Sequence, residues 1–253
     1  MPIALITVPC LSDNYAFLIH DDDTGRTALI DVPEAAPIRA VLRDRGWTLT
    51  DILLTHHHDD HVQGLAELRG TARVIGAAAD AHRLPPLDLA VADGDRITVY
   101  GHDVDVIDVP GHTVGHVAFH MAFEKLLFTA DSLMAMGCGR LFEGTPAQMW
   151  DSLQRLRALP GDTTVCSGHE YTTTNMRFAL SLEPDNPALI SRSAAIRTAR
   201  ENGHATVPSP LALECRTNPF LRADDPDLAR ALAMPAAHPA EIFTEIRARR
   251  DRF

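Results

Sequence analysis

Histidine and aspartate residues are concentrated in one short segment that has the spacing of a metal site. Residues 55–61 read THHHDDH and follow the apolar residues 52–54, which are predicted to form a buried strand. In an extended backbone, side chains two residues apart point to the same side. His56 and His58 can therefore bind one metal ion, while His57 points away.

The end of this segment offers ligands for a second ion. Asp60 and His61 lie at the turn into a predicted helix, in which Val62, Leu65 and Leu68 recur at helical spacing. Imidazole and carboxylate ligands without thiolates suit zinc, and they also accept iron or manganese. We therefore expect two divalent metal ions, with zinc preferred and iron or manganese as alternatives.

Three further ligand-type residues follow predicted strands in the same way. Two of them come after a glycine, which permits the tight backbone geometry of such a junction. A histidine at a strand end often has only a structural role, but four such strand ends in one chain favour a shared metal site. The three residues are His112 after residues 104–109, Asp131 after residues 126–129, and His169 after residues 163–166.

The elements that must position these residues change in type along the chain. Up to about residue 170, short apolar runs bounded by turn residues predict mainly strands, with helices between them. Beyond this point the pattern predicts helices and no convincing strand. We therefore expect a catalytic domain at 1–170 and a helical substrate-binding domain at 171–253. Strands are expected at residues 3–8, 16–19, 27–30, 52–54, 73–75, 96–100, 104–109, 117–121, 125–129 and 163–166, a hairpin loop at 21–25, and helices at 151–159, 175–182, 187–201 and 240–250.

The composition limits the class of function. The formal net charge of −11 argues against a nucleic-acid-binding protein, which needs a strongly basic surface. No apolar stretch reaches the roughly 18 residues needed to span a bilayer, and the first residues do not resemble a signal peptide. We expect a cytoplasmic protein that binds neither nucleic acid nor membrane. No CxxC pair occurs among the four cysteines, which are expected to be reduced: Cys10, Cys138, Cys166 and Cys215.

The motifs around these residues resemble those of the metallo-β-lactamase superfamily, and within it the glyoxalase II (hydroxyacylglutathione hydrolase) family. THHHDDH, PGHTVGH, FTADSL and SGHEYT are similar to the metal motifs of that family, and LSDNYAFLI, GCGRLFEGT and NPFLR also resemble it. The resemblance covers residues 11–253. It implies an α+β fold, an αββα sandwich of two mixed, mostly antiparallel sheets flanked by helices, followed by a small C-terminal all-helical domain.

The resemblance also implies how the ligands are shared between the two ions. The first metal set comprises His56, His58 and His112. The second set comprises Asp60, His61 and His169, and Asp131 bridges the two ions. Asp31 matches an acidic position that orients a ligand histidine, and His57 and His116 are expected to have structural or supporting roles.

The implied activity is hydrolysis of S-D-lactoylglutathione and related 2-hydroxyacyl glutathione thioesters to glutathione and D-lactate, the second step of methylglyoxal detoxification. In the expected mechanism, a metal-bridging hydroxide attacks the thioester carbonyl, and the metal pair stabilises the oxyanion. The expected partner is this small-molecule substrate, and we expect a monomer. Acyl-group preference is not determined by the sequence.

Five residues match positions that contact glutathione in the family, and two substitutions depart from its pattern. Phe142 stands where many members have tyrosine, so one hydroxyl contact is expected to be absent. Asp59 replaces an aromatic or small residue and adds negative charge near the metals. The substrate-binding candidates are Arg140, Phe142, Tyr171, Arg247 and Arg250.

Other functions are compatible with parts of the pattern. A glutathione persulfide dioxygenase would hold one iron with two histidines and one carboxylate, and would not need the second complete ligand set. Another superfamily hydrolase, such as a nuclease, or a non-catalytic binding module are further alternatives. Cys138 between two glycines could suggest a nucleophile, but no base for it is identifiable.

Overall fold

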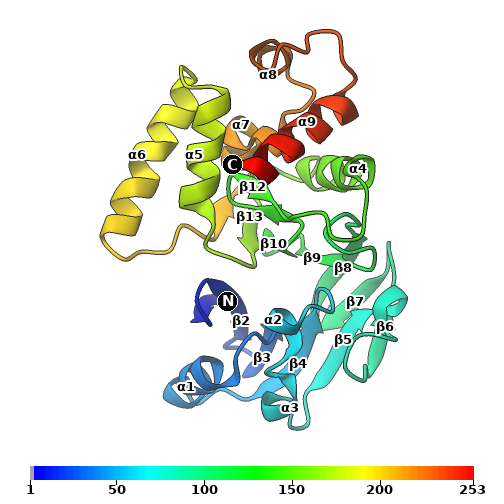
Figure 1. Ribbon diagram of the computed structural model, residues 1–253. Coiled ribbons are helices and arrows are strands. Elements are labelled where there is room, and N and C mark those ends of the chain that lie inside the picture. The colour runs from blue at the N-terminus through cyan, green and yellow to red at the C-terminus, as the bar shows by residue number, and fades with distance from the viewer. Residues whose placement is uncertain (1–2) are drawn as a thin grey trace. The chain divides into compact units, whose positions relative to one another are not determined.

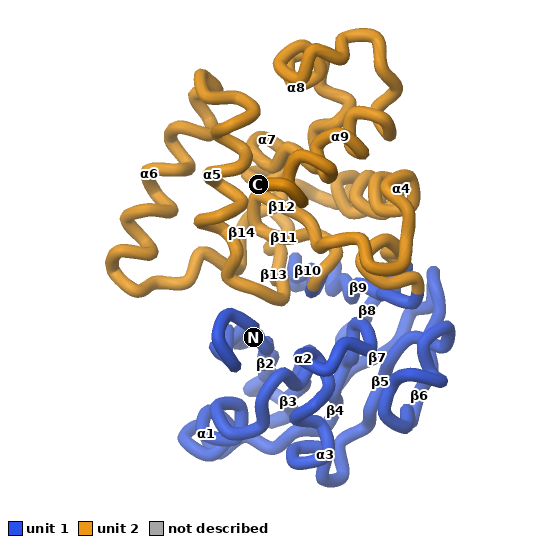
Figure 2. Tube along the Cα trace, in the orientation of Figure 1, with its two compact units in different colours: residues 1–108, 115–130 blue, residues 109–114, 131–253 orange. Residues whose placement is uncertain are grey.

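The computed structural model describes residues 3–253, and the chain forms two compact units. Unit 1 comprises the residues up to Asp108 together with Gly115–Ala130. Unit 2 comprises Val109–Val114 and Asp131–Phe253. Figure 1 labels the helices and strands, and Figure 2 distinguishes the two units by colour.

The first sheet of unit 1 is mixed and has six strands in the order β1-β2-β3-β4-β5-β6. The first three strands pair antiparallel, and β3 to β6 pair parallel. The predicted hairpin loop between β2 and β3 is present, and Gly25 there takes a left-handed φ of 67°. The strands are β1 (Ala4–Cys10), β2 (Asn14–Asp21), β3 (Arg26–Ile30), β4 (Leu49–Leu54), β5 (Arg73–Ala77) and β6 (Leu89–Val91).

The second sheet of unit 1 is antiparallel and packs against the first. Its strands within this unit follow the order β10-β9-β8-β7. Phe17 of β2 lies against Phe128 of β10, with ring centroids 5.9 Å apart, so the two sheets share an apolar interior. The strands are β7 (Arg96–Val99), β8 (His102–Asp108), β9 (Val117–Met121) and β10 (Leu126–Ala130).

Helices cover the opposite face of the first sheet (Figure 1). Because side chains alternate along a strand, Leu18 points away from the neighbouring sheet and joins an apolar cluster with Ile38 and Leu42 of α1 (Ala35–Arg45). Leu65 of α3 (Leu65–Leu68) belongs to the same cluster. This burial holds α1 and α3 against the first sheet.

The helix predicted from the spacing of residues 62, 65 and 68 is divided into two short helices, α2 (Asp59–Val62) and α3. The reason is a long-range contact. Val32 N donates to His61 O at 2.7 Å, and Gly64 N donates to Val32 O at 2.9 Å, so these groups do not continue a helix. A Cβ at Gly64 would lie 2.9 Å from the backbone N of Ala35. The backbone bond from Val32 therefore holds His61 next to the segment that precedes α1.

Unit 2 is mainly helical. The predicted helices near 175–182, 187–201 and 240–250 are confirmed as α5 (Thr172–Leu182), α6 (Pro187–Glu201) and α9 (Pro239–Arg252). The helix predicted at 151–159 begins earlier, because Thr145 and Gln148 form a capping box at the start of α4 (Pro146–Arg157). The other helices are α7 (Leu211–Thr217) and α8 (Pro226–Ala231), with short 3₁₀ helices at Ala78–Asp80 in unit 1 and Pro219–Leu221 in unit 2.

Short strands complete unit 2. β11 (Leu133–Met134) and β12 (Gly137–Cys138) form a hairpin. β13 (Thr164–Ser167) pairs antiparallel with β14 (Ser209–Pro210), a two-residue strand in the region where we expected only helices. The boundary proposed at residue 170 stays a prediction, since residues 131–170 belong to the same compact unit as the C-terminal helices. Within residues 3–253, no helix combines the length and the apolar character required to cross a membrane.

Candidate metal centre

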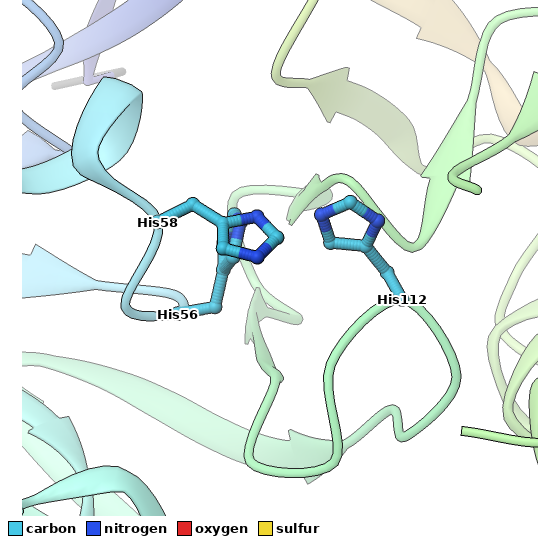
Figure 3. Close-up of side chains that lie close together, drawn as sticks. All are labelled: His56, His58 and His112. Carbon is cyan, nitrogen blue, oxygen red and sulfur yellow. The ribbon is translucent and has the colours of Figure 1, made fainter. Parts of the chain in front are cut away.

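The first group of predicted ligands lies in unit 1, directly after β4. His56 is fully buried, and its Nε2 lies 3.2 Å from Nδ1 of His58. Figure 3 shows these two imidazoles extending from the same loop. The ring of His61 lies 4.2 Å from that of His56. The structure therefore gathers the three predicted histidine ligands of the THHHDDH segment, as their alternation and the turn into α2 led us to expect.

Asp31 fixes the orientation of His61. Its Oδ2 lies 2.8 Å from Nδ1 of His61, and it also accepts hydrogen bonds from the backbone N and the hydroxyl of Thr55. Nδ1 is thereby bonded to a carboxylate, which leaves Nε2 as the nitrogen on the opposite side of the ring. That Nε2 lies 3.9 Å from Oδ2 of Asp60. The Asp60 carboxylate is itself held by Asn14 Nδ2, at 3.0 Å.

The remaining histidines of the motifs surround this group. His57 points away, as the alternation predicts, and its Nδ1 lies 2.9 Å from Oδ2 of the buried Asp80. The ring of His116 stacks on that of His56 at 4.5 Å. Asp80 was not among the residues predicted from the sequence, although an acidic residue shortly after a predicted strand was a usable signal. Asp59 is exposed in the first turn of α2.

The second group of predicted ligands lies in unit 2. His112, Asp131 and His169 are all buried, and the two oxygens of Asp131 face different histidines. Oδ2 lies 3.4 Å from Nε2 of His112, and Oδ1 lies 3.3 Å from Nε2 of His169. Nδ1 of His112, whose ring appears in Figure 3, lies 2.7 Å from the carbonyl oxygen of Arg140. A carbonyl only accepts, so Nδ1 carries the hydrogen and Nε2 has a lone pair directed toward Asp131.

These two groups have the chemistry of divalent-metal sites. In each, an imidazole nitrogen lies 3.2–3.4 Å from another potential ligand atom. Nδ1 of His61 contacts the Asp31 carboxylate, and Nδ1 of His112 contacts the Arg140 carbonyl. Contacts of this kind orient the imidazole ring in many metal sites. Among residues 3–253, the groups able to hold a metal consist of histidine and aspartate only, without cysteine. This donor set suits a divalent ion with nitrogen and oxygen ligands.

Three of the predicted substrate residues are accessible in unit 2, which also holds the second group of predicted metal ligands. The Arg140 side chain is 64% exposed, and its Nε lies 3.9 Å from Oδ1 of Asp251. Phe142 is 61% exposed, and its ring centroid lies 5.3 Å from that of His112. Tyr171 is partly exposed and stacks on the ring of His169 at 4.7 Å. Two aromatic rings therefore lie beside the predicted ligands of this unit, and Arg140, whose backbone carbonyl contacts His112, presents an exposed cation.

The two predicted C-terminal contacts differ from each other. Arg250 is partly exposed, and its guanidinium lies 3.3–3.4 Å from Oδ1 of Asn175. Burial, and after it the nearby Arg247 cation, lower the pKa of Arg250. Arg247 itself is buried, with 6% exposure, and contacts Cys138 and Asp251. Only Arg250 of this pair presents an accessible guanidinium.

Cys138 does not have the properties of a nucleophile. Its side chain is buried, and burial raises the pKa of its thiol to about 11, although the neighbouring Arg247 cation opposes the shift. The reactive form of cysteine is the thiolate, which is scarce at neutral pH when the pKa is this high.

The sequence and the fold agree with known proteins over the whole chain. A family model described as the metallo-beta-lactamase superfamily matches residues 12–169, and one described as the hydroxyacylglutathione hydrolase C-terminus matches residues 170–253. Relatives named hydroxyacylglutathione hydrolase are 64% identical in Ruegeria pomeroyi, over 100% of both chains, and 55% identical in Rhodobacter capsulatus, also over 100% of both.

Solved structures show the same fold at lower identity. The structure of ETHE1 from Myxococcus xanthus is 26% identical with a TM-score of 0.62, covering 96% of this chain and 99% of its own. The BLEG-1 B3 metallo-beta-lactamase is 21% identical with a TM-score of 0.67, covering 86% and 99%. With its two sheets, flanking helices and C-terminal helical region, the chain belongs to the hydroxyacylglutathione hydrolase (glyoxalase II) family of the metallo-β-lactamase superfamily.

Proposed function

We propose that the chain hydrolyses S-D-lactoylglutathione and related 2-hydroxyacyl glutathione thioesters to glutathione and a 2-hydroxy acid, at a centre of two divalent metal ions. The observation that carries the proposal is the position of Asp131, whose two oxygens face His112 and His169 separately. One carboxylate that faces two imidazoles in this way is suited to bridging two ions. The full-length relatives named hydroxyacylglutathione hydrolase support the choice of substrate.

The division of the ligands between the ions follows the resemblance to the family. His56, His58 and His112 would hold the first ion. Asp60, His61 and His169 would hold the second, and Asp131 would be shared by both. We propose zinc for both positions, and iron or manganese fits the same nitrogen and oxygen donors.

When bound, the two ions supply Lewis acidity, which lowers the pKa of water and polarises the thioester carbonyl. The chain's own residues set the charge of the site: five neutral imidazoles leave the ionic charge unchanged, and Asp60 and Asp131 together subtract two of four positive charges. The Asp31 carboxylate and the Arg140 carbonyl keep the rings of His61 and His112 in fixed tautomers. The site therefore remains cationic and favours a developing oxyanion.

The glutathione part of the substrate carries carboxylates, which an acidic protein of net charge −11 repels unless cations lie near the site. Arg140 and Arg250 provide such cations in unit 2, and Tyr171 offers a phenolic hydroxyl to the peptide. Phe142 adds an apolar surface beside His112. A thiolate leaves readily, so the reaction needs no separate general acid. A monomeric state and a location in the cytoplasm are further parts of this proposal.

Metal analysis combined with a thioester assay tests the proposal. We expect purified protein to contain about two metal ions per chain and to consume S-D-lactoylglutathione, with the activity lost on chelation and regained on adding zinc. His169→Ala should lower both metal content and turnover, whereas His204→Ala, at an exposed position of unit 2, should change neither. Chelator-resistant hydrolysis would refute the mechanism. One iron per chain with oxygen consumption, or cleavage of a β-lactam or phosphodiester in place of the thioester, would refute the substrate assignment.

A further inference from the structure

Two neighbouring strands of the first sheet place a buried carboxylate beside a histidine of the THHHDDH segment. β4 and β5 pair parallel, with Leu54 opposite Gly76, so both strands end at the same edge of the sheet. His57 follows the last residue of β4 by three positions, and Asp80 follows the last residue of β5 by three positions. Oδ2 of Asp80 lies 2.9 Å from Nδ1 of His57. The pairing of the two strands therefore accounts for this long-range contact.

The Asp80 side chain is held in place by further contacts. It is fully buried, and its Oδ1 accepts a hydrogen bond from Nε of Arg83 at 3.1 Å. The Asp80 carbonyl accepts from the backbone N of Arg83 at 2.8 Å and from that of Leu84 at 2.9 Å. Leu84 belongs to the same buried apolar cluster as Leu18. Because the guanidinium compensates the buried charge, Asp80 is a fixed acceptor for His57.

The same carboxylate contacts the segment that leads into β9. A Cβ at Gly115 would lie 2.3 Å from Cγ and from Oδ1 of Asp80, so the Gly115 backbone packs directly on the carboxylate. The next residue, His116, stacks its ring on that of His56 at 4.5 Å, with the ring planes 11° apart. Asp80 thus contacts two segments of unit 1: the one that carries His56 and the one whose histidine stacks on it.

We propose that Asp80 is a positioning residue for the first metal ion. Its carboxylate holds the His57 ring on one side of the extended segment, and side-chain alternation then directs His56 and His58 to the other side. The inference rests on the proposed function, because the roles of His56 and His58 as ligands belong to that proposal. It deepens that function by identifying a buried group outside the ligand set that determines the affinity for this ion.

Asp80→Asn in the full-length protein is the first test. The amide has nearly the volume of the carboxylate, but it offers one acceptor oxygen to two donors, His57 and Arg83. We expect the apoprotein to bind zinc about tenfold more weakly, the lower end of the range for groups that orient metal ligands. Competition with a chromogenic chelator measures this affinity without any thioester reaction. The absorption bands of the cobalt-loaded variant should also change, because they report the arrangement of the ligands.

Asp88→Asn is the matched control. Asp88 lies in the same connection between β5 and β6, and it also accepts hydrogen bonds from a guanidinium and from the backbone. Its partners are Arg69 Nη2 at 2.8 Å and Val74 N at 2.8 Å, which lie outside the two segments that Asp80 contacts. This variant should retain the wild-type zinc affinity and cobalt spectrum. Circular dichroism and thermal unfolding show whether each variant is folded and how far its stability falls.

A double-mutant cycle tests whether Asp80 acts through His57. His57→Leu removes the donor and should weaken zinc binding by a factor similar to that of Asp80→Asn. The double variant should show little further loss, because each change breaks the same contact, whereas independent effects would multiply to about 100-fold. The His57 side chain is partly exposed, so His57→Leu preserves the test if Asp80→Asn does not fold.

The outcomes separate the inference from the function on which it rests. A lower Tm for Asp80→Asn, with the zinc affinity of the Asp88→Asn control, would show a merely structural role and overturn the inference. Effects of the His57 and Asp80 changes that multiply would overturn it as well. Wild-type protein that binds zinc but cleaves no thioester would instead refute the proposed function, and the zinc affinities of the variants would still decide the role of Asp80.

Discussion

Nδ1 of His61 and Oδ2 of Asp31 lie 2.8 Å apart in the interior of unit 1. The carboxylate is fixed at the same time by the backbone N and the hydroxyl of Thr55, the residue that precedes the proposed ligand His56. Asp31 takes an unusual left-handed φ of 57°, at the end of β3. The buried Asp31 side chain therefore links the end of β3 to the end of β4 by hydrogen bonds, and it sets the tautomer of His61.

Asp31→Asn should weaken metal binding more than it weakens the fold. The amide cannot accept from both the Thr55 backbone and the His61 ring as two carboxylate oxygens do, so the ring loses its fixed orientation. We expect zinc affinity to fall by about 10-fold to 100-fold, with a parallel loss of kcat. Equilibrium competition with a chelator measures the affinity.

Asp51→Asn is the matched control for this variant. Asp51 is a buried carboxylate of the same unit and pairs with Arg73 at 2.6 Å. The control should lose stability without losing metal affinity. Equal metal affinity in the Asp31 and Asp51 variants would show that Asp31 does not orient a ligand.

Gly139→Ala should disturb the unit 2 ligands through the backbone. The added Cβ would overlap the carbonyl oxygen of Asp131, and backbone atoms cannot move aside as a flexible side chain can. We expect the free energy of unfolding to fall by about 1–3 kcal/mol, the range for overpacked positions, together with metal content. Urea denaturation and metal analysis provide the two measurements.

The control for this change is Gly161→Ala, where the nearest atom to the new Cβ is the side-chain carbon of Ala212 at 3.2 Å. It should retain full metal content. A Gly139→Ala protein with wild-type stability and metal content would show that Gly139 is not packed against the Asp131 carbonyl as described.

Phe142→Tyr should increase substrate affinity. The ring is mostly exposed and lies beside His112, so an added hydroxyl can reach the glutathione backbone without being buried unpaired. A hydrogen bond of typical strength predicts a KM about threefold lower with little change in kcat. Steady-state kinetics measure both constants. Phe123→Tyr, at an exposed position in unit 1, should leave them unchanged, and a KM for Phe142→Tyr at or above wild type would contradict the prediction.

The sequence predicted those features of the site that depend on local pattern. The alternation of His56, His57 and His58 after a strand is a property of the backbone, and the structure reproduces it. The capping box of Thr145 and Gln148 was an equally local signal for the start of α4, but the helix start predicted from the sequence lies five residues later.

Contacts between residues far apart in the sequence could not be predicted from such local patterns. Nothing near Gly64 indicates that Val32 bonds to its backbone and divides the expected helix. Residues 209–210 form the strand β14 because they pair with β13, and no local sequence period indicates this pairing. The burial of Arg247 depends in the same way on Cys138, more than a hundred residues earlier. The ligand residue types were therefore predictable from local pattern. Of the groups that orient them, Asp31 was expected only from the family resemblance, and the carbonyl of Arg140 was not expected at all.

Cys138 should resist alkylation in the native enzyme. With its pKa raised to about 11, the thiolate fraction at pH 7.5 is roughly 100-fold or more below that of an ordinary thiol of pKa about 8.5. Treatment with iodoacetamide followed by mass spectrometry should therefore modify the less buried Cys215 before Cys138. Unfolding in urea should make the two cysteines react alike. Preferential alkylation of Cys138 with loss of thioesterase activity would contradict this prediction and support a role of Cys138 as a nucleophile.

The ion pair between Asp224 and Arg157 should make stability depend on pH in a defined range. Two guanidinium nitrogens of Arg157 lie 2.7 Å from the two carboxylate oxygens, and these hydrogen bonds lower the pKa of Asp224. The unfolded carboxyl titrates near about 3.9, so the stabilisation is fully present above that pH. It is lost as the pH falls through the lower pKa of the folded state.

Asp224→Asn should accordingly lower the Tm at pH 6 by about 1–3 °C, a modest value because the carboxylate is partly exposed to solvent. The difference from wild type should shrink when the pH is reduced from 5 to 3, because the wild-type carboxylate becomes protonated. Thermal unfolding across this range measures the effect, with the exposed Asp185→Asn as a control that should show no comparable trend. A Tm difference that stays constant down to pH 3 would mean that the charge of Asp224 does not stabilise the fold.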